Sequence, residues 1–328
     1  MTITPEPAAP DTLGGIGELA VLARIFPRLP TAASALLGPG DDAALVAAPD
    51  GRFVVTTDMM IHGPDFRLAW STPHDLGWKA AASNLADVAA MGAVPTALVV
   101  AIAAPADSPV SVLEGIADGL RDACETLAPG CGVVGGDLSV SATLTIAVTA
   151  FGDLEGRAPV LRSGAAPGDI VAVAGVLGEA AAALRLLFAE AIGTSGRPDT
   201  ALATALRSRT VAQLAPSPPI AAGRAAALAR ATAMLDLSDG LAIDSARLAR
   251  ASGVGINFAM AALGDDPALA LGGGEDHSLL ATFPPGVVLP AEFRRIGVCV
   301  DGEGLTVDGS PHDSAGWDPY RDWAGSAG

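Results

Sequence analysis

The sequence predicts a mixed α/β (α+β) protein of two domains. Its 328 residues are enough for two domains of ordinary size. Half of the residues are hydrophobic, so a large core can form, and 39 glycines and 25 prolines supply many turns. Frequent turns suit alternating strands and helices better than a helical bundle. We place the domain boundary in the connector of residues 152–168, which gives domains 1–158 and 159–328.

The first half is expected to alternate between strands and helices. The stretch 53–57 is rich in β-branched valine and threonine and predicts a buried strand. A helix is predicted from about residue 72 to 91, with Ser71 or Thr72 as its cap, Pro73 in its first turn and Gly92 at its end. The other predicted elements are helices at 17–26 and 110–127, strands at 44–47, 96–103, 132–134 and 143–151, and a loop at 59–70.

The second half restarts with a strand at 170–174. Asp239 is placed to cap the helix that follows it, and its carboxylate could also face an ion. Three glycines at 272–274 indicate a close approach of the backbone beside Glu275, a potential ligand-binding residue. The other predicted elements are helices at 178–191, at 221–231 and early in 198–219, and strands at 255–260 and 278–283.

Composition excludes several classes of function. The net charge of −17 disfavours nucleic acid and anionic membrane surfaces as partners. The only lysine is Lys79, so a GxxxxGK[ST] phosphate loop is absent. Three scattered cysteines, and the lack of GxSxG, HExxH and CxxC motifs, disfavour nucleophilic and zinc chemistry. The N-terminus lacks a basic start and an apolar core, and the longest apolar run, 97–104, is too short to span a bilayer, so we expect a cytoplasmic protein.

Five acidic segments follow apolar runs, and together they indicate carboxylates that converge on metal ions. Hard divalent cations such as Mg²⁺ prefer oxygen ligands of this kind. One such segment is weak evidence, because an acidic turn is usually only a turn. The five are 40–42, 56–58, 84–87, 135–137 and 236–240.

Each of these segments also has a purely structural interpretation. Asn84 and Asp87 share one face of a mostly apolar helix, which an exposed helix edge would explain equally well. Gly135-Gly136-Asp137 can approach a phosphate and its metal, or form a hairpin turn. Arg162 suits a phosphate, although a surface ion pair is the commoner fate of arginine. Trp317 is either a platform for an aromatic ligand or a core anchor.

Taken in order, these motifs resemble the thiamine-monophosphate kinase family, which shares its fold with aminoimidazole ribonucleotide synthetase and selenophosphate synthetase. The match covers nearly the whole chain, and its motifs are far more specific together than singly. The matching stretches are 38–44 (GPGDDAA), 56–58 (TTD), 84–93 (NLADVAAMGA), 135–137 (GGD), 161–165 (LRSGA), 236–241 (DLSDGL) and 273–276 (GGED).

The resemblance implies an N-terminal domain whose mixed sheet pairs with that of a second subunit in a homodimer, and a C-terminal α/β domain folded over it. It implies ATP-dependent phosphorylation of thiamine monophosphate to the diphosphate by direct transfer, assisted by several Mg²⁺ ions. The implied Mg²⁺ ligands are Asp42, Thr56, Thr57, Asp58, Asp87, Asp137, Asp236 and Asp239. The implied ATP contacts are Gly136, Asp137, Arg162 and Ser238, and the implied contacts to the thiamine moiety are Glu275 and Trp317.

Two departures from the family pattern lie on the acceptor side. The family usually has a substrate-contacting histidine before a phenylalanine in the loop after the first metal strand, and here that position is Asp65. His62 lies three residues earlier and could take its place. The segment 263–271 is also shorter than the family's equivalent. These departures leave two alternatives open: a same-fold kinase or synthetase with another acceptor, or a paralogue that binds metal and nucleotide without turnover.

Overall fold

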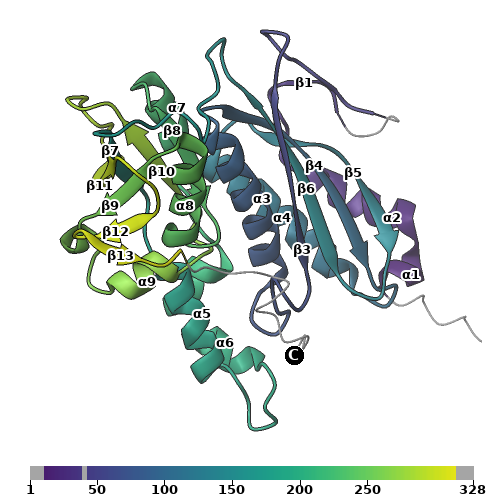
Figure 1. The fold of residues 1–328 in the computed structure, drawn as a ribbon. Coiled ribbons are helices and arrows are strands. Elements are labelled where there is room, and N and C mark those ends of the chain that lie inside the picture. The colour runs from purple at the N-terminus through teal and green to yellow at the C-terminus, as the bar shows by residue number, and fades with distance from the viewer. Residues whose placement is uncertain (1–10, 39–42, 315–328) are drawn as a thin grey trace, which may run out of the picture.

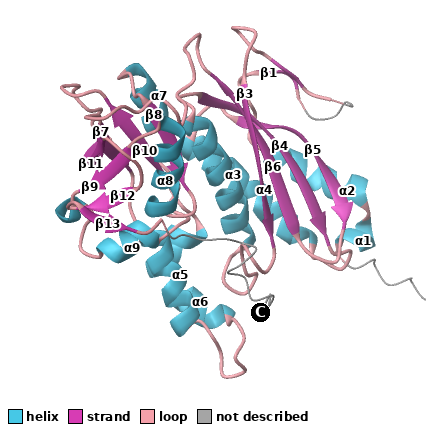
Figure 2. Ribbon diagram, viewed as in Figure 1, coloured by secondary structure: helices cyan, strands magenta, loops and turns pink. Residues whose placement is uncertain are grey.

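The computed structural model describes residues 11–38 and 43–314, and it confirms the mixed α/β prediction. Two sheets dominate the described part of the chain: a four-stranded sheet of order β3-β6-β4-β5 and a seven-stranded sheet of order β13-β12-β9-β11-β7-β10-β8. Helices lie between the two sheets (Figure 1), and Figure 2 shows the same arrangement by element type. A short hairpin, β1 (Ala35–Leu37) with β2 (Leu45–Val46), is not hydrogen-bonded into either sheet, and its Ala35 and Val46 pack in a cluster with Ala97 and Val134 of the four-stranded sheet.

The four-stranded sheet presents two different faces. Its strands are β3 (Val54–Ile61), β4 (Val94–Ala104), β5 (Gly132–Val140) and β6 (Thr145–Asp153). Side chains of a strand alternate between faces. Thr56, Asp58 and buried Met60 of β3 face the helices, whereas Thr57 and Met59 face the opposite side. We call that opposite side the open face, because Phe53, Val55 and Met59 are each more than half exposed there.

Two helices cover the inner face: α3 (Pro73–Ala90) and α4 (Val110–Leu127). Thr72 caps α3 as predicted. Its hydroxyl accepts a hydrogen bond from the Asp75 backbone N–H, and the Asp75 carboxylate accepts one from the Thr72 backbone N–H. The two helices meet through glycines, so their backbones approach closely. A Cβ placed on Gly77 would lie 2.0 Å from the Ile116 carbonyl oxygen, and one on Gly119 would lie 2.0 Å from that of His74.

In the seven-stranded sheet of the second half, β7 (Ile170–Ala174) lies beside β10 (Ser278–Phe283), and β8 (Ala233–Leu237) is the edge strand next to β10. On β8, Met234 packs on the side of α3 and α7 (Ile220–Leu228), and Leu235 and Leu237 pack towards α8 (Leu241–Ser252). The remaining elements of this half are α5 (Glu179–Glu190), α6 (Thr200–Leu214), β9 (Gly255–Phe258), the 3₁₀ helix η2 (Met260–Ala262), α9 (Pro267–Gly272), β11 (Phe293–Val300), β12 (Leu305–Val307) and β13 (Ser310–His312). Near the N-terminus lie α1 (Leu13–Ile16), α2 (Glu18–Ile25) and the 3₁₀ helix η1 (Phe26–Arg28).

Three local predictions were wrong. The loop predicted at 59–70 begins later, because β3 continues to Ile61 by pairing with Thr145–Ala147 of β6. The predicted turn at 135–137 lies within β5, where parallel pairing with β4 across a bulge keeps the strand extended. Asp239 does not cap α8: the N-cap is Gly240, and the Asp239 carboxylate accepts from Arg247 instead.

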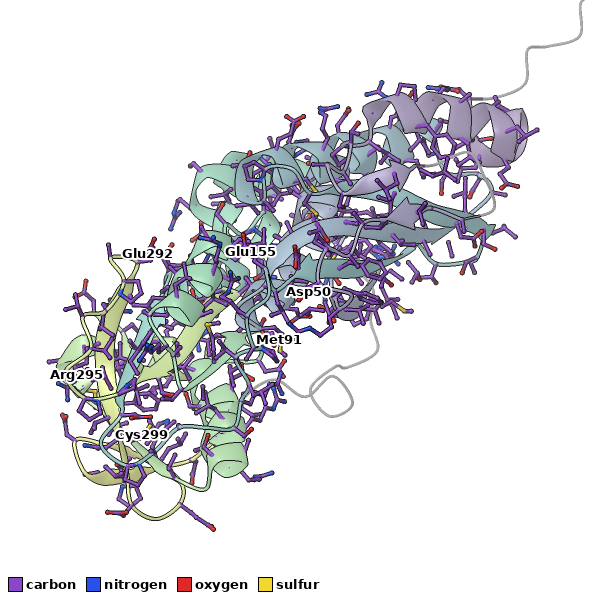
Figure 3. All side chains as sticks on the ribbon, turned by 90° about the horizontal axis from the view of Figure 1, so that it is seen from above. Asp50, Met91, Glu155, Glu292, Arg295 and Cys299 are labelled. Atoms are coloured by element: carbon purple, nitrogen blue, oxygen red, sulfur yellow. The ribbon has the colours of Figure 1, made fainter. Side chains whose placement is uncertain are left out.

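The two halves share one core and several polar links. Buried residues of α3, β4 and β6 form a continuous cluster with Ala172, Met234 and Phe283 of the second half. Glu155, just beyond β6, pairs with Arg224 of α7 at 2.6 Å, and Figure 3 places Glu155 and Met91 where the halves meet. Within the described residues, no helix is both long and apolar enough to cross a membrane.

Candidate active site

Three carboxylates from separate elements gather where the inner face of the four-stranded sheet meets β8. Asp58 comes from β3, Asp87 from α3 and Asp236 from β8. The Thr56 hydroxyl donates to Asp87 Oδ2 at 2.9 Å, and the Asp58 backbone N–H donates to Asn84 Oδ1 at 3.1 Å. The Asn84–Asp87 face of α3 therefore faces other polar groups inside the protein, which excludes the exposed-edge interpretation.

The electrostatics of this cluster show uncompensated negative charge. Desolvation, together with the Asp236 and Asp58 carboxylates, raises the pKa of Asp87 to about 7. Desolvation also raises the pKa of Asp58, and the charges of Asp236, Glu275 and Asp65 add to the effect against the opposing charge of His277. Each ionised carboxylate thus makes its neighbours harder to ionise, and a bound cation would relieve this repulsion.

The donor set fits Mg²⁺. Carboxylate and hydroxyl oxygens are the ligands that this hard ion prefers, and Mg²⁺ commonly binds through one or two carboxylates while keeping several waters. The described residues contain no group of three or more His, Cys, Asp or Glu side chains already close enough to hold a metal ion. The fit therefore rests on the oxygen chemistry and the raised pKa values, and the cluster is not a preformed cage.

A second set of charged groups adjoins these carboxylates. Glu275 forms an ion pair with Lys79 of α3, and His277 Nδ1 lies 3.3 Å from Asp236 Oδ2. Asp65 accepts a hydrogen bond from the Ile61 backbone N–H at 2.7 Å, and its pKa is raised by desolvation and by the charge of Glu275. The structure therefore brings Asp65 and Glu275, both expected on the acceptor side, into one charged environment.

The loop after β8 holds two further candidates in a different arrangement. Asp239 Oδ2 and Asp244 Oδ1 both accept from Arg247 Nη1 at 2.6 Å. The other Asp244 oxygen accepts from the backbone N–H groups of Asp239 and Gly240, and desolvation raises the Asp244 pKa to about 6. Asp244 thus shapes the segment that carries Ser238 and Asp239.

Three expected site residues lie away from the cluster. Asp137 of β5 pairs with Ala101 of β4, Ala101 pairs with Ala147 of β6, and Ala147 pairs with Met59 of β3. Residues paired in this way point to the same face of the sheet, so the Asp137 side chain lies on the open face with Met59. It is separated from β3 by three strand spacings, or about 14 Å. Gly136 precedes it on the same exposed edge strand, and Thr57 lies on the open face, where its hydroxyl donates to the Val148 carbonyl.

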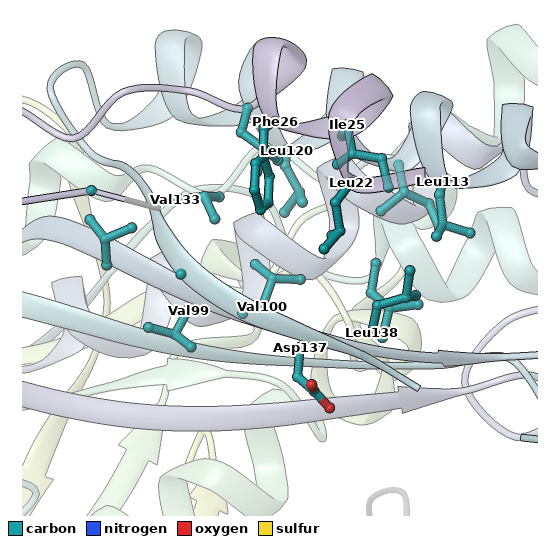
Figure 4. Close-up of a pocket in the computed structure, with 18 of the residues that line it drawn as sticks. Leu22, Ile25, Phe26, Val99, Val100, Leu113, Leu120, Val133, Asp137 and Leu138 are labelled. Carbon is teal, nitrogen blue, oxygen red and sulfur yellow. The ribbon is translucent and has the colours of Figure 1, made fainter. Parts of the chain in front are cut away.

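A cavity of about 420 Å³ lies between α2, α4 and the strands β4 and β5, and Gly135, Gly136 and Asp137 are among the residues that line it. Figure 4 shows the mainly apolar lining, with the Asp137 carboxylate pointing away from the labelled apolar side chains. Its walls include Leu22, Phe26, Leu113 and Leu138. This mainly apolar cavity does not include Asp58, Asp87 or Asp236 in its lining.

The remaining candidates are less constrained. Arg162 is exposed, and its carbonyl oxygen accepts from the Ser252 hydroxyl at 3.0 Å. The Ser238 carbonyl accepts from the Glu275 backbone N–H at 2.8 Å. Asp42 and Trp317 lie outside the described residues.

Sequence reasoning assigned no role at the site to Lys79 or His277. Both are buried in the charged environment around Glu275. The sequence did carry one signal for Lys79: it is the one lysine of the chain, and a lysine within an apolar helical stretch is unusual. His277 offers no such signal, because the backbone that places it has φ values of 71° at Glu275 and 51° at His277, which the sequence does not reveal.

The sequence of this chain is similar to those of several known proteins. The family described as AIR synthase related protein, N-terminal domain, matches residues 40–154. The thiamine-monophosphate kinase of Mycobacterium tuberculosis is 45% identical over 328 residues, which cover 95% of this chain and 92% of the relative. The chain belongs to the thiamine-monophosphate kinase family. Another member of this family, from Corynebacterium glutamicum, is 38% identical over 320 residues and covers 90% of this chain and 92% of its own.

Solved structures of the thiamine-monophosphate kinase family share the fold. The crystal structure of thiamine monophosphate kinase from Aquifex aeolicus superposes with a TM-score of 0.70 at 33% identity, covering 83% of this chain and 92% of that one. AaThiL complexed with AMPPCP and TMP also gives a TM-score of 0.70 at 33% identity, with coverage of 84% and 90%.

We predict that Asp87→Asn stabilises the metal-free protein at pH 8. The folded-state pKa of Asp87 is about 7, above its value in the unfolded chain, so ionisation of this carboxyl penalises the folded state above that pH. The linkage limit is about 4 kcal/mol, and relaxation and salt reduce it to on the order of 1–2 kcal/mol, or about 1–3 °C in Tm for a chain of this length. The penalty fades as the pH falls below 7 and is absent below about 4, so the advantage of the variant disappears in acid.

Thermal unfolding between pH 5 and pH 8, with and without Mg²⁺, measures this effect. Mg²⁺ should raise the Tm of the wild type more than that of the variant. Asp50→Asn is the matched control, because Arg52 lowers the Asp50 pKa and its removal should not stabilise. A variant advantage that is equal at pH 5 and pH 8 would contradict the assignment.

Proposed function

We propose that the chain catalyses ATP-dependent phosphorylation of thiamine monophosphate to thiamine diphosphate. An oxygen of the acceptor phosphate attacks the γ-phosphorus of ATP in line, the bond to the bridging oxygen breaks, and ADP leaves with the electron pair. The acceptor phosphate has a second pKa of about 6, so it is already anionic at neutral pH and needs no strong general base. The main barrier is the approach and alignment of two polyanions.

The observation that carries this proposal is the convergence of Asp58, Asp87 and Asp236 from three elements, in a chain that is 45% identical to a thiamine-monophosphate kinase over nearly its whole length. Carboxylates that repel one another are costly unless a cation offsets them. With Mg²⁺ bound, their charge would be balanced and the ion would screen and orient phosphate oxygens. Thr56 holds the Asp87 carboxylate in place for this role.

The expected ATP contacts lie in two separate places within one chain. Gly136 and Asp137 lie on the edge strand of the N-terminal sheet, and Arg162 and Ser238 lie in the second half. We propose that a homodimer brings these two groups together, so that Asp137 and Thr57 of one subunit complete the site of the other. Exposed apolar residues on the open face support this pairing, since large apolar patches commonly mark interfaces.

The domain boundary proposed near residue 158 fits the exit from β6 at Asp153 and the start of β7 at Ile170. We place the reaction in the cytoplasm, where ATP is supplied.

A dimer formed through the open face predicts that Val55→Asp with Met59→Asp yields a monomer. These side chains are 54% and 58% exposed in the single chain, and a carboxylate buried at each position would be strongly unfavourable. Light scattering after size-exclusion chromatography measures the mass. Val288→Asp is the control, because Val288 is 89% exposed but lies on another part of the surface. A double variant that keeps the mass of the wild type would place the interface elsewhere.

The activity itself is tested by incubating the chain with ATP, Mg²⁺ and thiamine monophosphate and separating the products by chromatography. Formation of ADP and thiamine diphosphate in equal amounts is the expected result. ATP binding without turnover would overturn the proposed acceptor, and a screen of phosphate acceptors would then separate a kinase with another substrate from a protein that only binds nucleotide.

A further inference from the structure

Lys79 is the only lysine of the chain, and it is buried at the site. It lies on α3, its side chain is 7% exposed, and its ammonium pairs with Glu275 Oε2. Buried lysines are rare unless they are paired. In the amide orientation that satisfies both of its polar atoms, Gln213 of α6 accepts from Lys79 Nζ at 3.1 Å and donates to the Ala180 carbonyl at 3.2 Å.

Glu275 is held from several directions but remains partly open. Its backbone has φ of 71°, a conformation that costs energy for a non-glycine residue and needs support from its surroundings. That support includes the hydrogen bond from its N–H to the Ser238 carbonyl at 2.8 Å. The side chain is 42% exposed, and its contact with the Lys79 ammonium is made through Oε2.

The charges nearby favour an ionised, oriented Glu275. Desolvation would raise its pKa, but the Lys79 ammonium and His277 hold that pKa below its ordinary value. Lys79 also favours the ionised form of Asp65, which opposes the effects of desolvation and of Glu275. One buried cation therefore serves both carboxylates on the acceptor side.

We infer that Lys79 is a positioning residue for the phosphate acceptor. By fixing one oxygen of Glu275, it presents the other oxygen to the non-phosphate part of the acceptor, which must then carry an N–H donor or a positive charge. This inference rests on the proposed function, and it assigns acceptor recognition to the pair Lys79–Glu275. Lys79 acts through Glu275 and has no part in phosphoryl transfer itself.

A second ion pair in the same region provides a matched control. Arg207 of α6 pairs with both oxygens of Asp75 of α3, and the Asp75 side chain is fully buried. Both pairs thus tie α3 to neighbouring elements, but only Lys79 reaches Glu275. A variant that merely loosens α3 should therefore look the same whether Lys79 or Arg207 is replaced.

The test is steady-state kinetics of the full-length protein with thiamine monophosphate and ATP varied separately. Lys79→Met should raise the KM for thiamine monophosphate about tenfold or more, because Glu275 is no longer fixed and its charged hydrogen bond to the acceptor is lost. The KM for ATP should stay within about twofold of the wild-type value. Lys79→Arg should recover part of the loss. Arg207→Met should lower Tm without separating the two KM values.

Other outcomes overturn the inference. Equal rises of both KM values, or the same pattern in Arg207→Met, would reduce Lys79 to a structural role. If Lys79→Met does not fold, Gln213→Leu removes the neutral partner and should give a smaller selective rise, and an unchanged KM would reject the idea. Absence of turnover in the wild type would instead reject the proposed function, so the two failures are distinguishable.

Discussion

Asp58→Asn should lower kcat by about 10³-fold or more while the protein stays folded. Asparagine has nearly the same shape, and the hydrogen bond from the residue 58 backbone N–H to Asn84 does not involve the side chain. The substitution therefore removes a charge from the Asp58–Asp87–Asp236 cluster with little change in packing. Loss of that charge should weaken cation binding at the proposed metal site.

The measurement is the rate of thiamine diphosphate formation at saturating substrates, with Tm as a check on folding. Asp50→Asn is a matched control, because Asp50 pairs with Arg52 on the surface. That variant should keep full activity. If Asp58→Asn is as active as the control, the metal assignment is wrong.

The same variant also tests the shared site. Asp137→Asn should be inactive alone, and a mixture with Asp58→Asn should recover about a quarter of the wild-type activity after subunits exchange. In a random mixture of two-fold dimers, half are mixed, and each mixed dimer has one site with both native residues. Recovery near zero would mean that Asp137 does not act across an interface.

Gly119→Ala should destabilise the protein by about 3 kcal/mol or more, although alanine is the better helix former. Helix propensity alone would favour alanine by about 1 kcal/mol. Packing opposes this, because the new Cβ would lie 2.0 Å from the His74 carbonyl oxygen and 2.8 Å from the Trp78 nitrogen. Both are backbone atoms of α3, so α3 and α4 would have to move apart.

Thermal or urea unfolding decides between these two effects by the sign of the change. Ser111→Ala is a suitable comparison, because Ser111 is exposed on the same helix α4, and it should change stability only slightly. A gain in stability for Gly119→Ala would show that the helices separate at little cost. A loss in activity should accompany the loss in stability, since α3 carries Asp87 and Lys79.

Local sequence signals predicted the parts of the fold that depend on neighbours in the chain. The α3 cap at Thr72 and the shared face of Asn84 and Asp87 follow from local spacing, and both are present. The course of β5 through residues 135–137 could not be predicted, because it depends on pairing with β4. The ion pair of Lys79 with Glu275 also joins segments almost two hundred residues apart, and no local pattern contains it.

The alternation of β3 has a consequence for how this protein can change. Thr56 and Asp58 serve the interior, and Thr57 and Met59 serve the exterior. Inserting one residue before Thr56 would exchange these roles along the rest of the strand, because side chains repeat every second residue. In the proposed dimer, catalysis and subunit pairing would then be lost in a single step, whereas an insertion of two residues would restore the alternation. We therefore expect related chains to vary in length in the turn before β3 and to keep the strand itself free of single-residue insertions.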